Sequence, residues 1–97
     1  MNPKIITAIE NMNLLEFNYK GHIRIVEPHA YGITVKSNEV LRAYQTDGTS
    51  DSGDVPDWRL FSVNKIESLK VLDETFTKPR YGYKMGDSAM DKIYCEI

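Results

Sequence analysis

Two arginines, Arg24 and Arg59, are the residues whose types and positions best suit ligand binding in this 97-residue chain. Each occurs in a segment where apolar and polar residues alternate, which is typical of a β-strand. A guanidinium group presents planar, forked N–H donors that fit phosphate oxygens, and it stacks on nucleobases. Tyr19, His22 and Tyr44 add rings on which bases stack. This combination favours binding of nucleic acid or a nucleotide.

The same alternation has a simpler interpretation. Polar residues between apolar ones line the solvated face of a half-buried strand, and Arg24 and Arg59 would then contact only water. Arg42 and Lys65 are open to both interpretations. Tyr19 is equally open, because a ring in a strand often packs in the core or at its rim.

A second group of basic and aromatic residues occupies positions 80–84, with the sequence Arg-Tyr-Gly-Tyr-Lys. It could clasp a ligand or a protein partner. The simpler prediction is that Tyr81 and Tyr83 pack the C-terminal tail against the rest of the protein. Arg80 and Lys84 would then remain in water.

Recognisable catalytic and metal-binding motifs are absent from the sequence. His22 and His29 have no third metal ligand nearby, and there is no nucleophile elbow and no glycine-rich phosphate loop. The acidic stretch 47–57 lacks the Glu and Gly positions of a calcium loop. We therefore predict a protein that is not an enzyme and that needs no cofactor and no metal.

Composition indicates one small globular domain. Hydrophobic residues make up 41% of the chain and charged residues 27%, which is ordinary for a soluble protein. No stretch approaches the ~20 apolar residues of a membrane span, and the N-terminus lacks a signal-peptide pattern. We expect a cytoplasmic protein without membrane contact. Cys95 is the only cysteine, so an intramolecular disulfide is excluded, and we expect a buried or half-buried side chain rather than a reactive thiol.

The negative charge is concentrated in one segment. The net charge is −2, which does not by itself indicate nucleic-acid binding. Residues 47–57 contain four aspartates and no base, while the segments on either side are slightly basic. A local basic face therefore remains compatible with the total charge. Because residues 46–57 also contain glycines and a proline, we predict a long, mobile acidic loop there.

The remaining patterns predict a mainly β fold with flanking helices. Asn2-Pro3 is a typical helix start, and the apolar spacing that follows predicts an N-terminal helix within residues 1–13. Alternation then predicts five strands in residues 14–73, with Pro28 marking an edge, a bulge or a strand end. Short strands joined by tight turns favour a five-stranded SH3/Sm-like β-barrel. The tail, 74–97, is predicted to end in a short helix whose apolar stripe is Met90, Ile93, Tyr94 and Ile97.

Several motifs, in this order, resemble a WYL domain over about residues 4–76. They are Ile5-Ile6-Thr7-Ala8-Ile9, Phe17-Asn18-Tyr19, Arg24-Ile25-Val26-Glu27-Pro28, Val40-Leu41 and Arg59-Leu60-Phe61-Ser62-Val63-Asn64-Lys65-Ile66. The chain departs from the family where Glu39 and Val40 replace the name-giving Trp and Tyr, and where Lys65 replaces an Arg. The winged-helix DNA-binding domain that usually precedes a WYL domain is not among these residues.

The resemblance implies a short, free-standing WYL-like protein with an SH3/Sm-like barrel that senses a ligand. Such domains bind nucleic acid or nucleotide-type ligands and serve in transcription regulation, DNA-damage responses, CRISPR effectors and phage defence. Carried over by position, the implied ligand-binding residues are Tyr19, His22, Arg24, Arg42, Arg59 and Lys65.

We therefore predict a regulatory binding module for single-stranded nucleic acid or a nucleotide. The alternative is a protein-interaction module, such as a phage or mobile-element accessory that docks on or inhibits a larger complex, or that forms a homodimer. The negative total charge and the missing Trp-Tyr pair favour that alternative.

Overall fold

A helix opens the chain in the computed structural model, which describes residues 1–51 and 53–97. This helix, α1 (Pro3–Asn11), begins where Asn2-Pro3 predicts. The Asn2 side-chain oxygen accepts hydrogen bonds from the N–H groups of Lys4 at 3.0 Å and Ile5 at 3.4 Å, which satisfies donors that the first turn would otherwise leave free. Met12 ends the helix in a left-handed conformation, with φ 54°.

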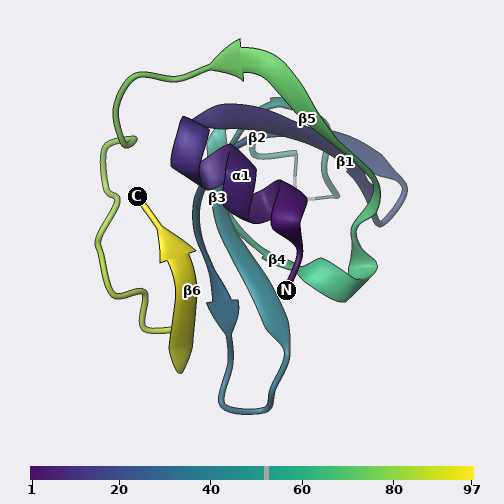
Figure 1. The fold of residues 1–97 in the computed structure, drawn as a ribbon. Helices are drawn as coiled ribbons and strands as arrows, with labels where there is room; N and C mark the ends of the chain where they lie inside the picture. Colours follow the sequence, from purple (N-terminus) through teal and green to yellow (C-terminus); the bar gives the residue numbers. More distant parts are fainter. Residues whose placement is uncertain (52) are drawn as a thin grey trace.

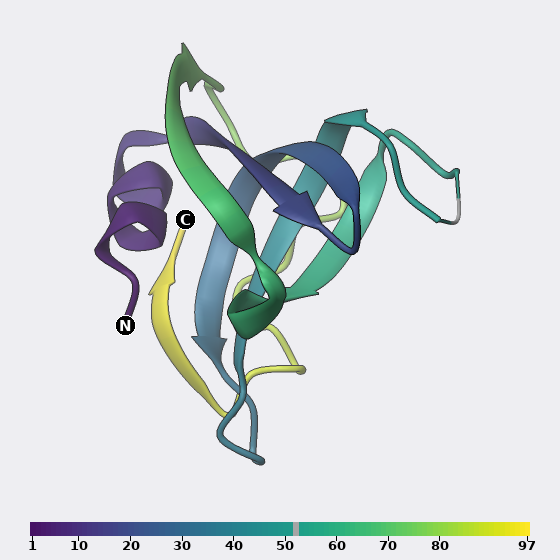
Figure 2. The ribbon, with the colours of Figure 1, turned by 90° about the vertical axis from the view of Figure 1, so that its right-hand side faces the viewer.

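The part of the chain that the structure describes contains six strands in one antiparallel sheet (Figures 1 and 2). They are β1 (Asn13–Tyr19), β2 (His22–Ile33), β3 (Glu39–Gly48), β4 (Asp57–Ser62), β5 (Glu67–Thr75) and β6 (Lys92–Glu96), and one 3-10 turn, η1 (Val63–Lys65), lies between β4 and β5. The pairing order is β4-β3-β2-β1-β5, and β6 pairs with β2. The fold is therefore mainly β with an N-terminal helix, as predicted.

The predicted closure into a five-stranded barrel is wrong, because the sheet stays open. Its two ends are β4 and β5, which pair only with β3 and β1 among the described residues. The turn η1 separates them, and β5 carries exposed charged side chains, a feature that keeps natural sheet edges unpaired. These side chains are Lys70, Asp73 and Glu74.

The predicted C-terminal helix is also wrong, because residues 92–96 form β6. Strand β2 is twelve residues long, and β1 pairs only with its first part, Val26 being the last partner of β1. β6 pairs with β2 from Ala30 to Ile33 and so satisfies backbone groups that β1 leaves free. A free helix of this length is marginal in water, so the strand pairing prevails. Cys95 lies in β6 and is half-buried, as expected.

The core lies between α1 and the concave side of the bent sheet. Helix α1 contributes Ile5 and Ile9, and the sheet contributes larger side chains. The largest of these are Leu15, Phe17, Tyr31, Leu41 and Phe61, none more than 1% exposed. None of the helical segments in the described ranges has the length and apolar character that a membrane crossing requires.

A buried histidine joins the C-terminal tail to the sheet. The ring of His29 is 0% exposed. Its Nδ1 contacts the Glu27 carbonyl at 2.8 Å, and its Nε2 accepts a hydrogen bond from the Arg80 N–H at 3.0 Å. The Arg80 guanidinium also binds the Glu27 carboxylate at 2.6 and 3.1 Å. The prediction that Arg80 is merely solvated is therefore wrong, as is the predicted packing of Tyr81, which is 99% exposed. Tyr83 does pack, with its ring 5.1 Å from that of His29.

Gly32 makes room for β6. A Cβ at this position would lie 2.3 Å from the Lys92 carbonyl oxygen and 3.1 Å from the Ile93 Cα. We expect Gly32→Ala to displace β6, to lower the free energy of unfolding by about 1–3 kcal/mol, and to accelerate hydrogen exchange of the β6 amides. Gly21→Ala is the control for β6 exchange, because a Cβ there meets nothing within 4 Å, and the strain from its φ of +80° falls in the β1–β2 turn and not at β6. Unchanged exchange in Gly32→Ala would contradict the β6 pairing.

His29 should make stability depend on pH. Burial lowers the pKa of His29 below its ordinary value, so the unfolded chain takes up a proton on this ring before the folded protein does. The stabilisation is complete above the unfolded pKa of about 6.5 and is lost as pH falls below it, by at most about 1.4 kcal/mol per pH unit. Urea unfolding between pH 7.5 and 5.5 should show this loss, and His29→Gln should remove it. His22→Asn, at the other histidine, should retain it; a loss unaffected by His29→Gln would contradict this assignment.

Candidate functional site

The structure brings Arg24 and Arg59 to one open pocket of about 200 Å³. Arg24 comes from β2 and Arg59 from β4, with β3 between these strands. The two guanidinium groups are close enough that Arg59 contributes to lowering the pKa of Arg24. The lining residues are Tyr19, Lys20, Arg24, Ser50, Asp51, Arg59, Leu60 and Phe61. We call this the arginine pocket.

Arg24 is buried and hydrogen-bonds to no carboxylate among the described residues, although Asp51 acts on it through space. It is 4% exposed, whereas its neighbour Ile23 is 49% exposed, so Arg24 lies on the inner side of β2. Its partners are neutral: the Gln45 side-chain oxygen at 3.3 Å and the Tyr19 carbonyl at 3.1 Å. Its Nε has no hydrogen-bond partner among the described residues. The solvated-face interpretation is therefore wrong for Arg24, and burial, more than Arg59, lowers its pKa.

Arg59 connects the sheet to the acidic loop. Strand β3 runs to Gly48 and β4 starts at Asp57, so this loop is shorter than the predicted 46–57, and Ser52 lies outside the described residues. The Arg59 side chain is 18% exposed, with Nη1 3.7 Å from the Asp57 carboxylate. Its Nη2 donates to the Ser50 hydroxyl at 3.2 Å and to the Asp54 carbonyl.

His22 holds the same loop at the rim of the arginine pocket. Its Nε2 lies 2.8 Å from the Asp51 carboxylate, and its Nδ1 lies 2.8 Å from the Thr49 hydroxyl. The hydrogen bond to His22 lowers the pKa of Asp51, so this carboxyl group is ionised at neutral pH. Lys20, Arg24 and Arg59 thus line the pocket together with the Asp51 carboxylate, and Arg59 is also paired with Asp57.

Tyr19 forms the floor of the arginine pocket and does not stand free. It is 8% exposed, and its ring centroid lies 5.0 Å from that of Phe61 in an edge-to-face arrangement. Its hydroxyl accepts a hydrogen bond from the Ser62 N–H at 3.0 Å. The Arg24 guanidinium carbon lies 5.4 Å from the Tyr19 ring centroid, which is within the range of a cation–π contact. Tyr19 therefore positions Arg24 and leaves no open face for a base.

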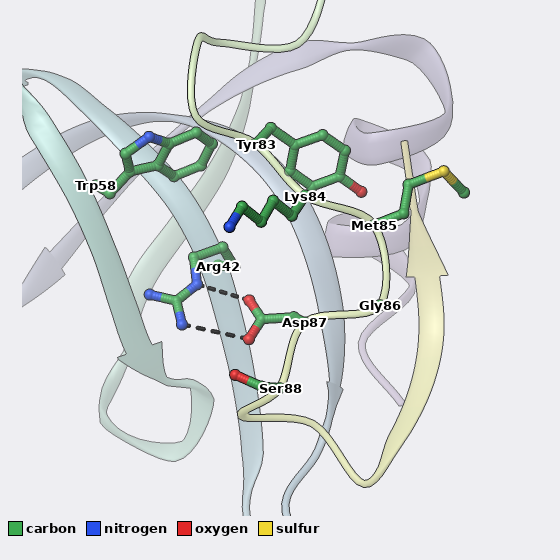
Figure 3. Close-up of a pocket in the computed structure, with 8 residues that line it drawn as sticks. All are labelled: Arg42, Trp58, Tyr83, Lys84, Met85, Gly86, Asp87 and Ser88. Carbon is green, nitrogen blue, oxygen red and sulfur yellow. Dashed lines mark hydrogen bonds and ion pairs between the residues drawn. The ribbon is translucent and has the colours of Figure 1, made fainter.

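The other two predicted residues lie elsewhere. Arg42, in β3, lines a second pocket of about 390 Å³ (Figure 3). Its guanidinium binds the Asp87 carboxylate through two hydrogen bonds, of 2.7 and 3.3 Å. Lys65 is exposed in η1 and lines neither pocket. The structure thus brings three of the six predicted residues, Tyr19, Arg24 and Arg59, to the arginine pocket, with His22 beside it on Asp51. Tyr44 instead lies under Arg80, 4.7 Å from its guanidinium carbon.

Sequence reasoning missed Lys20, Gln45 and the specific role of Asp51. Lys20 looks like an ordinary turn residue beside Gly21, and Gln45 like a polar position near the end of a strand. Nothing in the pattern distinguishes Asp51 from the other aspartates of its segment. Their roles depend on register between strands, which spacing along one strand does not reveal. The described residues contain no group of three or more His, Cys, Asp or Glu side chains placed to hold a metal ion.

Replacing Arg24 should separate stability from binding. A buried charge without a hydrogen-bonded counter-ion is costly, so Arg24→Met, which keeps much of the volume, should leave the free energy of unfolding equal to that of the wild type or raise it by up to about 2 kcal/mol. Gln45→Met is the control that keeps the charge and removes its acceptor, together with the hydrogen bonds that Gln45 donates to the Asp47 and Thr49 carbonyls. We expect a loss of about 1–3 kcal/mol. Chemical unfolding measures both. A larger loss for Arg24→Met than for Gln45→Met would show that Arg24 serves stability.

Comparisons of the chain with models of protein families, with curated proteins and with solved structures found no match. The WYL resemblance therefore remains a prediction from the motifs quoted above.

Proposed function

We propose that this protein is a non-enzymatic, regulatory binding module whose arginine pocket receives a phosphate group of a single-stranded nucleic acid or of a nucleotide. The observation that carries this proposal is the buried Arg24 guanidinium, which hydrogen-bonds only to neutral groups, leaves its Nε without a partner among the described residues and lies beside Arg59. A phosphate oxygen would accept the hydrogen bond that Nε lacks and would add negative charge beside Arg24.

The chemistry of the pocket favours a phosphate group over a larger moiety. Small-molecule pockets commonly enclose roughly 300–1,000 Å³, whereas this one measures about 200 Å³. Charge-assisted hydrogen bonds from guanidinium to phosphate are among the stronger ones, and in a partly desolvated site they gain further strength. The rest of the ligand, sugar and base, would lie outside on the protein surface.

The fold supports the same role. A helix followed by five antiparallel strands, with β4 and β5 at the two ends and η1 between them, is compatible with an SH3/Sm-like strand order in a sheet that stays open between β4 and β5. In that arrangement β6 is an addition to the basic sheet. Together with the WYL-like motifs, this favours a ligand sensor of the kind used in transcription regulation or phage defence.

Fluorescence anisotropy with short labelled DNA and RNA single strands tests the proposal. We expect binding that weakens with salt, because phosphate contacts release counterions. Arg24→Met and Arg59→Gln should each weaken it about tenfold or more, while Lys65→Gln, a charge-matched control outside the pocket, should not. Competition by a free nucleotide or by inorganic phosphate would show which part of the strand the pocket holds.

Two results of the anisotropy experiment would contradict the proposal. An absence of binding at low salt, or binding that Arg24→Met and Arg59→Gln leave unchanged, would overturn the proposal.

One observation favours the protein-interaction alternative. Two large side chains of the tail, Tyr81 and Met85, are 99% and 71% exposed, and exposed apolar groups often mark contact surfaces. In that case Tyr81→Ser with Met85→Ser should abolish self-association or capture of a partner, measured by light scattering and pull-down, and should leave the binding of single-stranded nucleic acid by the arginine pocket unchanged.

A further inference from the structure

The second pocket, which contains Arg42, has the composition of a small-ligand site. Figure 3 shows its residues converging from β3, β4 and the tail. Its volume of about 390 Å³ lies within the range of small-ligand pockets, roughly 300–1,000 Å³. It is lined by Arg42, Trp58, Tyr83, Lys84, Met85, Gly86, Asp87 and Ser88. We call it the tryptophan pocket.

Its aromatic wall is held in place. The Trp58 indole N–H donates to the Tyr81 carbonyl at 3.2 Å. The indole ring also packs edge-to-face against His29, with centroids 4.7 Å apart, and against Tyr44 at 5.5 Å. Tyr83 lies beside it with a plane inclined by 25°, and its hydroxyl donates to the Ile97 carbonyl at 3.0 Å. A ligand ring would therefore meet surfaces that need no rearrangement, which lowers the entropic cost of binding.

The charges of the pocket leave one cation free. Arg42 and Asp87 neutralise each other, and Arg42 keeps the pKa of Asp87 below its usual value. Asp87 is also fixed by the Ala89 N–H at 2.9 Å. Lys84 forms no hydrogen bond or ion pair with the rest of the described chain, and Figure 3 shows its side chain extending between the aromatic wall and the Arg42–Asp87 pair. The pocket thus combines a fixed aromatic surface with one unpaired ammonium group.

We propose that the tryptophan pocket binds a small planar aromatic ligand that carries a negative charge, with its ring against Trp58 and its carboxylate or phosphate on Lys84. Stacking of a ligand ring on the Trp58 indole adds binding energy that an anion without a ring does not have. An anion without a ring would leave the aromatic wall uncovered, and a neutral ring would leave Lys84 unpaired. The ligand class therefore follows from the two features together.

This site is separate from the arginine pocket. Trp58 and Arg59 are consecutive in β4, and consecutive side chains of a strand project to opposite faces. The tryptophan pocket is lined by Trp58 and the arginine pocket by Arg59. Each can therefore be disabled without the other, and the inference does not depend on the function proposed above.

Trp58 is the only tryptophan of the chain, so its fluorescence reports on this pocket directly. Adenosine monophosphate and benzoate, one a phosphate and one a carboxylate, are the probes, with adenosine and benzamide as neutral counterparts and inorganic phosphate as an anion without a ring. We expect a saturable fluorescence change at millimolar concentration or below from one or both aromatic anions. The neutral compounds and inorganic phosphate should bind at least about threefold more weakly than the aromatic anions, a difference that the energy of one exposed ion pair can produce.

Variants locate the binding. Lys84→Ala should raise the dissociation constants of the aromatic anions at least about threefold. Lys78→Ala, at a control lysine of the tail outside the tryptophan pocket, should leave them unchanged. Arg24→Met should leave the titration unchanged. A titration that Lys84→Ala does not alter, one that Arg24→Met abolishes, or an absence of saturable change with both aromatic anions would overturn the proposal. The two experiments are independent. A protein that binds no single-stranded nucleic acid in the anisotropy experiment can still bind aromatic anions in the tryptophan pocket, and the absence of aromatic-anion binding does not affect the anisotropy result.

Discussion

Strand β2 is the constraint on which the rest of the structure depends. Along one edge it pairs with β3 from Arg24 to Ile33, and along the other it pairs first with β1 and then with β6. It also carries most of the buried polar side chains, namely Arg24, Glu27 and His29. A strand enclosed on both edges must satisfy its backbone through neighbours, and its inward polar side chains must find partners in the same crowded space.

The two halves of β2 meet that requirement differently. In the second half, Glu27 and His29 recruit Arg80 from the tail, so that charge meets charge and each ring nitrogen has a partner. In the first half, Arg24 meets an amide oxygen and a carbonyl, and its Nε meets nothing among the described residues. The same strand thus contains a completed polar cluster and an incomplete one. An incomplete cluster that borders an open pocket is where an outside anion gains the most.

Local patterns predicted much of this fold, but not its long-range pairing. Asn2-Pro3 specified the start of α1, and alternation indicated the strands from β1 to β5, with Pro28 beside the register shift before Ala30. The stripe of Met90, Ile93, Tyr94 and Ile97 fits a helix. The segment forms a strand instead, because it pairs with the edge of β2 that β1 leaves free. Whether β4 and β5 meet depends on the bend of the whole sheet. Their chemistry and the WYL resemblance pointed to Arg24 and Arg59. The partners of Arg24, however, depend on the register between β1, β2 and β3, and no short stretch of sequence specifies that register.

Strand β4 explains why two chemically different pockets occur in so small a protein. Among the described residues it pairs only with β3, so its other edge is open to loops that approach it from both directions. On one face the acidic loop meets Arg59, and on the other the tail meets Trp58. Because side chains alternate along a strand, Arg59 and Trp58 project to opposite faces of β4. Each lies in a pocket whose other wall comes from a loop or tail segment. The described residues of the acidic loop and residues 81–88 of the tail are not among the residues of the main core. The residues that define ligand chemistry there can therefore change without altering the packing that holds the sheet together.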